Sequence, residues 1–165
     1  MEVIDNFLQP YQFNAIKGTL LNDSHFNWHW QDGINHNVES NCFQFTHIFY
    51  SEEDGHNSPY FDMFECVSSA LNVKKLRSIK ANLNPRTFFK RFHGWHSDYP
   101  AKNGFEPGKT AILYINTNNG YTKFKKGGKV KCLENRLLLF DSYLLHSGVT
   151  CTDKKRKVVV NFNYL

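Results

Sequence analysis

The chain has 165 residues, a length that fits one domain with a buried core and needs no disulfides or structural metal. Hydrophobic residues make up 41% and aromatic residues 16%, which excludes a disordered tail, and no apolar run approaches the roughly 18 residues that a membrane span needs. The first residues lack the basic and apolar regions of a secretory signal. We therefore expect a cytoplasmic protein that does not act at a membrane.

The net charge of +5 is modest, and part of it is clustered in two lysine-rich segments, 123–131 and 154–157. Such clusters can bind phosphates or acidic partners, but a solvated loop face is the commoner explanation, so nucleic acid stays open as a partner without being favoured. The four cysteines form no CxxC pair, which predicts reduced, packing residues. The abundance of Asn, Lys, Phe and Tyr is typical of AT-rich coding DNA, as in many bacteriophages, in which case the location would be the host cytoplasm.

The first 74 residues predict helices that support a later core. Pro10 can open a helix, because proline is tolerated in the first turn, and apolar residues then recur on one face. The alternation over residues 26–30 predicts a strand, and residues 31–57 predict loops around a short apolar piece at 43–50. Ser58 and Pro59 are typical of a helix start. The apolar residues that follow at helical spacing are Phe61, Phe64, Val67 and Leu71.

From about residue 75 to the end, the pattern predicts a β core. Short apolar or β-branched runs are bounded by Gly, Asn, Asp or Pro, and no helical pattern separates them. These runs are residues 79–83, 87–92, 110–115, 128–133, 137–140 and 158–162. Half a dozen close-spaced strands are typical of a jelly roll, or double-stranded β-helix. We predict a mainly β domain over 1–165, with N-terminal helical support at 1–74 and the jelly-roll core at 75–165.

Candidate metal ligands appear in the segment His96-Ser97-Asp98. A histidine and a carboxylate two residues apart at the end of a strand project toward the same side and can share one metal ion. A second histidine, His146, follows just beyond the apolar strand at 137–140. Two imidazoles and one carboxylate leave the opposite face of an ion open, which suits Fe(II) enzymes that bind a chelating co-substrate and dioxygen. The HxD motif alone is weak, because eight histidines produce it often by chance.

Arg156 adds a second signal, ten residues after His146 at the start of the last predicted strand. A guanidinium there could grip a carboxylate by two parallel hydrogen bonds, although taken alone it is an ordinary turn charge. Two other classes of protein stay open at this point. One is a cupin-like or zinc hydrolase enzyme with the same metal ligands, and the other is a jelly-roll structural or binding protein without catalysis.

Several motifs follow one another in order over residues 79–165. They are His96-Ser97-Asp98, the strand at 110–116, the turn Asn119-Gly120-Tyr121-Thr122-Lys123-Phe124, the strand at 136–140, His146-Ser147-Gly148-Val149, and Arg156. In this order and spacing the segment resembles the catalytic core of the 2-oxoglutarate/Fe(II)-dependent dioxygenase superfamily, most closely its prolyl-hydroxylase-type members. Asn119 replaces the first glycine of that family's GGxTxF turn, and valines follow Arg156 where members often carry a Thr or Ser.

The resemblance implies an Fe(II) enzyme that consumes 2-oxoglutarate and O2, with ascorbate as a supporting reductant. His96, Asp98 and His146 would bind the iron and form the catalytic triad. The carboxylate of Asp98 favours hydroxylation, because halogenating relatives replace it to open a halide site. The substrate that the resemblance favours is a prolyl or other side chain in a peptide or protein, with a small metabolite and nucleic acid as the alternatives.

The resemblance also implies a co-substrate pocket. Arg156 would bind the distal carboxylate of 2-oxoglutarate, and Tyr114, by its place in the strand after HxD, would donate its hydroxyl to the same carboxylate. Asn82 and Asn84, on the strand before the triad, are further candidates for contacting the co-substrate. His93 would point away from His96, because two residues three apart on a strand face opposite sides. We expect His93 to line the pocket and not to bind the metal.

Overall fold

The computed structural model describes residues 1–34, 42–99 and 108–165, so part of the predicted 31–57 loop region lies outside the described residues. Three helical segments, α1 (Pro10–Asn22), the 3-10 helix η1 (Phe61–Phe64) and α2 (Glu65–Ala70), accompany the strands. The strands are β1 (Glu2–Ile4), β2 (His29–Asp32), β3 (Phe43–Ser51), β4 (Gly55–His56), β5 (Leu76–Pro85), β6 (Lys109–Tyr114), β7 (Tyr121–Phe124), β8 (Lys129–Lys131), β9 (Arg136–Asp141), β10 (His146–Val149) and β11 (Arg156–Tyr164).

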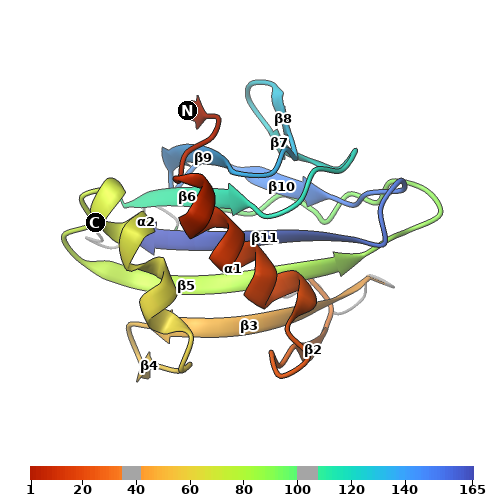
Figure 1. The fold of residues 1–165 in the computed structure, drawn as a ribbon. Coiled ribbons are helices and arrows are strands. Elements are labelled where there is room, and N and C mark those ends of the chain that lie inside the picture. Colours follow the sequence, from red (N-terminus) through yellow and green to blue (C-terminus); the bar gives the residue numbers. More distant parts are fainter. Residues whose placement is uncertain (35–41, 100–107) are drawn as a thin grey trace.

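Two antiparallel sheets form the β structure of the described residues. The larger sheet has the order β1-β9-β6-β11-β5-β3-β2, with β4 paired to β3, and the smaller has the order β10-β7-β8. Figure 1 shows α1 lying across one face of the larger sheet, with β10, β7 and β8 on the side away from this helix. The long strands β5 and β11 pair along their whole length at the centre. The predicted mainly β jelly roll with a short N-terminal helix is therefore confirmed.

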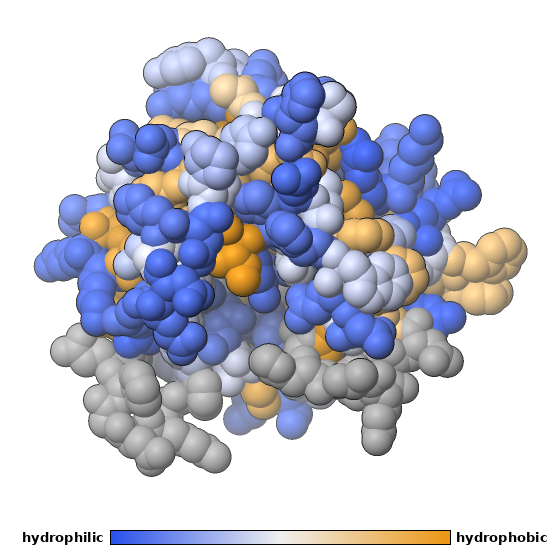
Figure 2. Space-filling view, turned by 90° about the horizontal axis from the view of Figure 1, so that it is seen from below, coloured by the Kyte–Doolittle hydropathy of each residue, from blue (hydrophilic) through white to orange (hydrophobic). Residues whose placement is uncertain are grey.

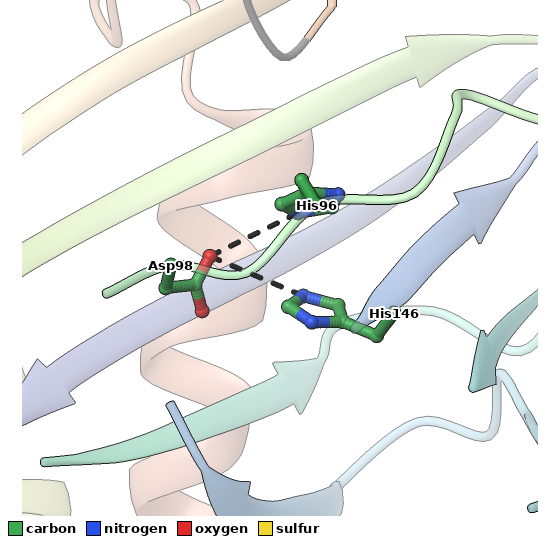
Figure 3. Close-up of side chains that lie close together, drawn as sticks. All are labelled: His96, Asp98 and His146. Carbon is green, nitrogen blue, oxygen red and sulfur yellow. Dashed lines mark ion pairs between the residues drawn. The ribbon is translucent and has the colours of Figure 1, made fainter. Parts of the chain in front are cut away.

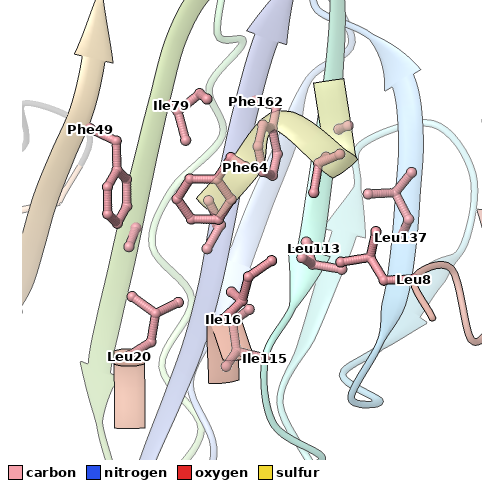
Figure 4. Packing of buried hydrophobic residues seen from close by; sticks show 14 of the residues in the cluster. Leu8, Ile16, Leu20, Phe49, Phe64, Ile79, Leu113, Ile115, Leu137 and Phe162 are labelled. Carbon is pink, nitrogen blue, oxygen red and sulfur yellow. The ribbon is translucent and has the colours of Figure 1, made fainter. Parts of the chain in front are cut away.

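The main apolar core lies between α1 and the larger sheet. Proline at the first turn starts α1, and the helix buries Phe13, Ile16 and Leu20, the apolar face that the sequence predicts. The sheet contributes the odd-numbered residues of β5 and β6 and the even-numbered residues of β11, because alternate side chains on a strand face opposite sides. Figure 4 shows these side chains meeting, among them Ile16 and Leu20 of the helix with Ile79 and Phe162 of the sheet.

A second apolar cluster lies on the opposite face, between the two sheets. It includes Tyr114 of β6, Phe124 of β7 and Phe140 of β9. Most of the side chains that β5 and β11 present on this face are polar and line a cavity. Because side chains alternate along a strand, β5 and β11 have one apolar face packed in the core and one mainly polar face that lines the cavity.

Two sequence predictions of local structure are wrong. Residues 87–92 form no strand: Phe92 makes one isolated bridge to Val149, and Phe88 and Phe89 are 90% and 74% exposed. These aromatic residues have high β propensity but no neighbouring strand to pair with. The apolar piece at 43–50 is not a fragment among loops but the nine-residue β3, which pairs with β5. The larger sheet therefore draws strands from both sides of residue 75.

Two further observations bear on the composition of the chain. All four cysteines are free thiols, as the sequence predicts, and Cys132 and Cys151 are buried. Among the described residues, no helix has the length and apolar character needed to cross a bilayer.

Candidate metal centre

The backbone holds His96 and His146 side by side. Their amides and carbonyls form a reciprocal pair of hydrogen bonds, His96 N to His146 O at 3.0 Å and His146 N to His96 O at 2.9 Å. Two residues fifty positions apart in the sequence thus act as neighbours on adjacent strands, although only His146 belongs to a named strand. Their imidazole rings lie 4.3 Å apart between centroids. The sheet pairing, not a local motif, brings the two imidazoles together.

Asp98 completes the cluster. Its Oδ1 lies 3.8 Å from His96 Nε2 and 3.9 Å from His146 Nε2, and one ligand atom from each residue falls within 4.8 Å of the others. Figure 3 shows the carboxylate pointing at both rings from the same side. Adjacent ligand atoms bound at about 2 Å to one ion lie about 3 Å apart, so the three side chains need to move together by only about 1 Å to hold an ion. Two imidazoles with one carboxylate are the donor set of non-haem Fe(II) sites. The residues fit a metal ion of that kind.

Other groups orient these three side chains. The Nδ1 of His146 lies 3.0 Å from the Leu144 carbonyl, which accepts its hydrogen and leaves Nε2 facing Asp98. Thr110 Oγ1 lies 2.7 Å from Asp98 Oδ2, on the oxygen that does not face the histidines. Such partners fix the tautomer and direction of metal ligands in proteins. The cluster is therefore oriented before any ion binds.

Burial keeps the nearby imidazoles neutral. It lowers the pKa of His96 to about 4, with the neighbouring His146 adding to the effect, while Asp98 opposes it. Burial also lowers the pKa of His93 to about 3, assisted by the charge of Lys157. Metal ions bind the neutral form of imidazole, so at neutral pH protons compete little for the His96 ring.

A large cavity surrounds the cluster. It has a volume of about 1040 Å³, and most of its lining comes from β5, β11, β3 and the segment from His93 to Tyr99. On the face of β5 and β11 away from α1, the lining residues are Ser78, Lys80, Asn82, Asn84, Lys157, Val159, Asn161 and Asn163, and Arg77 near the start of β5 also lines the cavity. Figure 2 shows a hollow on this side of the molecule with mainly hydrophilic residues inside it. The centre thus lies in a polar cavity open to solvent.

Most of the predicted site residues reach this cavity. His96, Asp98 and His146 line it, as do Asn82, Asn84 and His93. Tyr114 is fully buried just behind the wall, and its hydroxyl donates to Thr122 Oγ1 at 2.7 Å, with Thr122 itself in the lining. Burial raises the pKa of Tyr114, so the phenol keeps its hydrogen.

Arg156 is not among the residues that line the cavity. Its side chain lies on the helix side of β11 and donates a hydrogen bond to the Leu21 carbonyl at the end of α1. The next residue, Lys157, faces the cavity, because neighbouring residues on a strand point to opposite sides. The structure therefore brings a lysine, and not the predicted arginine, to this wall.

Lys157 is buried, with 2% of its surface exposed, and its side chain points between the sheets. Its Nζ donates to the Val149 carbonyl at 3.1 Å and lies 3.3 Å from the Tyr121 carbonyl. No acidic side chain among the described residues pairs with it, so burial lowers its pKa. A signal for Lys157 was present in the sequence. The polar residues Asn161 and Asn163 stand, like Lys157, at odd-numbered positions of this strand. The apolar residues Val158, Val160 and Phe162 stand at even-numbered positions, which face the core.

Neither a protein-family model nor a curated protein sequence matches the chain. Solved structures do match over nearly all of it. A prolyl hydroxylase from Trichoplax adhaerens, in complex with a hypoxia inducible factor peptide, aligns with 99% of this chain and 82% of its own, at a TM-score of 0.68 and 17% identity. The viral collagen prolyl hydroxylase of Paramecium Bursaria Chlorella virus-1 aligns with 99% of this chain and 94% of its own, at a TM-score of 0.64 and 13% identity.

Further matches, one of them to an epimerase, have the same architecture. A 2OG-Fe(II) oxygenase from Burkholderia pseudomallei aligns with 98% of this chain and 84% of its own, at a TM-score of 0.68 and 8% identity. An alpha ketoglutarate dependent epimerase, SnoN, aligns with 99% of this chain and 76% of its own, at a TM-score of 0.66 and 11% identity. The chain thus has the 2-oxoglutarate/Fe(II) oxygenase fold together with a triad-like group of two histidines and an aspartate. At these identities the similarity establishes the fold, and the fold carries more than one reaction.

Proposed function

We propose that this protein is an Fe(II)- and 2-oxoglutarate-dependent dioxygenase that hydroxylates its substrate. The observation that carries the proposal is the cluster of His96, Asp98 and His146, a 2-His-1-carboxylate donor set in a fold shared with such oxygenases. Bound Fe(II) would activate dioxygen at the expense of 2-oxoglutarate and so supply the oxidising power. The protein places the reactants and keeps bulk water away from them.

Lys157 is our candidate for the residue that binds the distal carboxylate of 2-oxoglutarate. It is a deeply buried cation in the cavity wall, and no carboxylate of the described residues neutralises it. A buried charge without a counter-ion is unfavourable, so a bound carboxylate would relieve that energy. Thr122 and Asn84 lie on the same wall and can add hydrogen bonds, with Tyr114 holding the Thr122 hydroxyl from behind. Arg156 would then hold α1 against β11 and would contribute little to binding the co-substrate.

For the substrate, we propose a side chain of a peptide or protein, with a prolyl residue first among the candidates. Support comes from the fold neighbours, one of which is a prolyl hydroxylase in complex with a peptide fragment. Exposed aromatic residues also lie on the segment between β5 and the triad: Phe88, Phe89, Phe92 and Trp95. Aromatic side chains of this kind are enriched where proteins contact one another.

A succinate-release screen tests this function. The protein would be supplied with Fe(II), ascorbate and 2-oxoglutarate and presented with proline-containing peptides, free amino acids and methylated DNA. We expect substrate-dependent succinate release with peptides, and a mass increase of one oxygen in the peptide concerned. No 2-oxoglutarate consumption under any condition, together with metal-dependent hydrolysis, would instead support a zinc enzyme.

A further inference from the structure

Lys80 is a second cation inside the cavity, at the end away from Lys157. It lies on β5 and its side chain faces the cavity, where the ammonium group makes no hydrogen bond or ion pair with a side chain or carbonyl of the described residues. The charge with which it interacts most is the Asp98 carboxylate, which raises its pKa while burial lowers it. If Asp98 binds a metal ion, its negative charge is committed to that ion. Lys80 then has no counter-charge of its own.

Two other charged groups at this end of the cavity have partners. Glu52 pairs with Lys75 at 2.5 Å, and the Arg77 guanidinium lies over the Tyr99 ring at 4.7 Å. Glu53 also lines the rim, where it is exposed to solvent. Lys80 thus differs from its neighbours in being a largely enclosed cation next to the candidate metal centre without an acidic partner among the described residues.

Asn161 stands beside Lys80. The two residues are directly paired in the β5–β11 register, and both face the cavity. Side chains at such positions start about 5 Å apart, close enough for both to contact one small group. The Oδ1 of Asn161 is buried and has no hydrogen-bond partner in the described structure. A buried acceptor of this kind lowers the stability of the fold until a donor reaches it. The pair therefore offers a cation and a free acceptor side by side.

Lys80 and Lys157 are too far apart to share one carboxylate. Lys157 is paired with Asn84, four residues along β5 from Lys80, which separates the two positions by about 13 Å at 3.3 Å per residue. Lys157 lies near His93 and Gly148, whereas Lys80 interacts with Asp98 and His96 of the metal cluster. Two cations this far apart can bind two separate anions.

We propose that Lys80 and Asn161 form a subsite that binds a carboxylate group of the substrate, with an N–H of the same substrate donating to Asn161. A carboxylate next to an N–H occurs in a free amino acid and at the C-terminus of a peptide. This inference rests on the proposed function, because it assigns Lys157 to the co-substrate. It restricts the substrate to molecules with a carboxylate close to the position that reacts.

Paramagnetic relaxation tests the subsite without knowledge of the substrate. Mn(II) replaces Fe(II), 2-oxoglutarate is bound, and sodium acetate is the probe, with neutral acetamide as its control. Acetate held by Lys80 lies close to Mn(II), so its methyl protons relax faster in the complex. We expect the apparent acetate affinity to fall about 10- to 100-fold in Lys80→Met, as for the loss of a charged hydrogen bond, and to recover in part in Lys80→Arg. Lys75→Met, which removes an exposed lysine nearby, should match the parent protein.

The outcomes separate the subsite from the proposed function. Equal acetate relaxation in the parent protein and Lys80→Met would overturn the subsite, as would a tenfold weaker affinity of Lys80→Met for 2-oxoglutarate, since Lys80 would then hold the co-substrate. Failure of the parent protein to bind 2-oxoglutarate at all would overturn the proposed function instead. Free L-proline and the tripeptide Gly-Pro-Ala, whose C-terminal residue has an N–H next to its carboxylate, are used in place of acetate. They distinguish an amino acid from a chain terminus as the source of the carboxylate.

Discussion

Thr110 and Asp98 are joined by a hydrogen bond of 2.7 Å between Thr110 Oγ1 and Asp98 Oδ2. Thr110 is completely buried at the start of β6, and its hydroxyl lies equally close to Asn163 Oδ1. The hydroxyl carries a single hydrogen, and the charged acceptor forms the stronger bond. Thr110 therefore holds one carboxylate oxygen so that the other faces His96 and His146. No sequence motif points to this residue.

We predict that Thr110→Val weakens metal binding about 10- to 100-fold, the usual effect of removing a partner that orients a metal ligand. Valine keeps the shape of threonine, so the fold should persist. Titration with Mn(II), followed by electron paramagnetic resonance of the free ion, measures the affinity. Thr110→Ser keeps the hydroxyl and should bind nearly as well as the parent protein. Equal affinity in the valine and serine variants would show that the hydrogen bond has no such role.

A second prediction separates Lys157 from Arg156. Lys157→Met should weaken 2-oxoglutarate binding roughly 30- to 5,000-fold, the 2–5 kcal/mol expected when one partner of a buried charge pair is removed. Arg156→Met should change it less than about threefold and should instead lower stability, because its bond to Leu21 is lost. Calorimetric titration of each Mn(II)-loaded variant gives the two affinities. The reverse order would restore Arg156 as the co-substrate ligand.

A third prediction concerns the triad itself. His96→Ala, Asp98→Ala and His146→Ala should each abolish 2-oxoglutarate turnover while circular dichroism shows an intact β fold. Their stabilities should differ. His146 is 2% exposed and packs against Phe140 at 4.7 Å, so its truncation should cost about 1–3 kcal/mol. His96 is less buried, so its truncation should lower the stability less. Turnover retained by any of the three folded variants would contradict the metal assignment.

The sequence alone predicts the parts of this structure that repeat a strong local pattern. The face of α1 follows from the spacing of Phe13, Ile16 and Leu20, and the ligand pair His96 and Asp98 follows from the two-residue period of extended chain. The polar face of β11 can also be predicted from the sequence, since Asn161 and Asn163 lie on the same face as Lys157. Arg156 fits the bidentate binding of a carboxylate better than a lysine does, but its side chain lies on the helix side of the strand.

Other features depend on contacts between distant segments. The bridge between His96 and His146 joins residues fifty positions apart, and the Thr110–Asp98 bond joins β6 to an irregular segment. The strand predicted at 87–92 has suitable residues but no partner, whereas β3 forms because β5 lies beside it. Strand formation is set by neighbours as much as by propensity. A single sequence does not specify which neighbours these are.

The thermal response to metal and co-substrate together tests the central claim most directly. Mn(II) and 2-oxoglutarate should each raise the melting temperature little, because the metal supplies one end of the 2-oxoglutarate site and Lys157 the other. Together, at a hundredfold excess over Kd, they should stabilise the fold by about 2.7 kcal/mol, which corresponds to roughly 5–10 °C for a domain of this size. A combined shift larger than the sum of the separate shifts is the result we predict. A melt in which 2-oxoglutarate adds nothing to the effect of metal alone would contradict the proposed function.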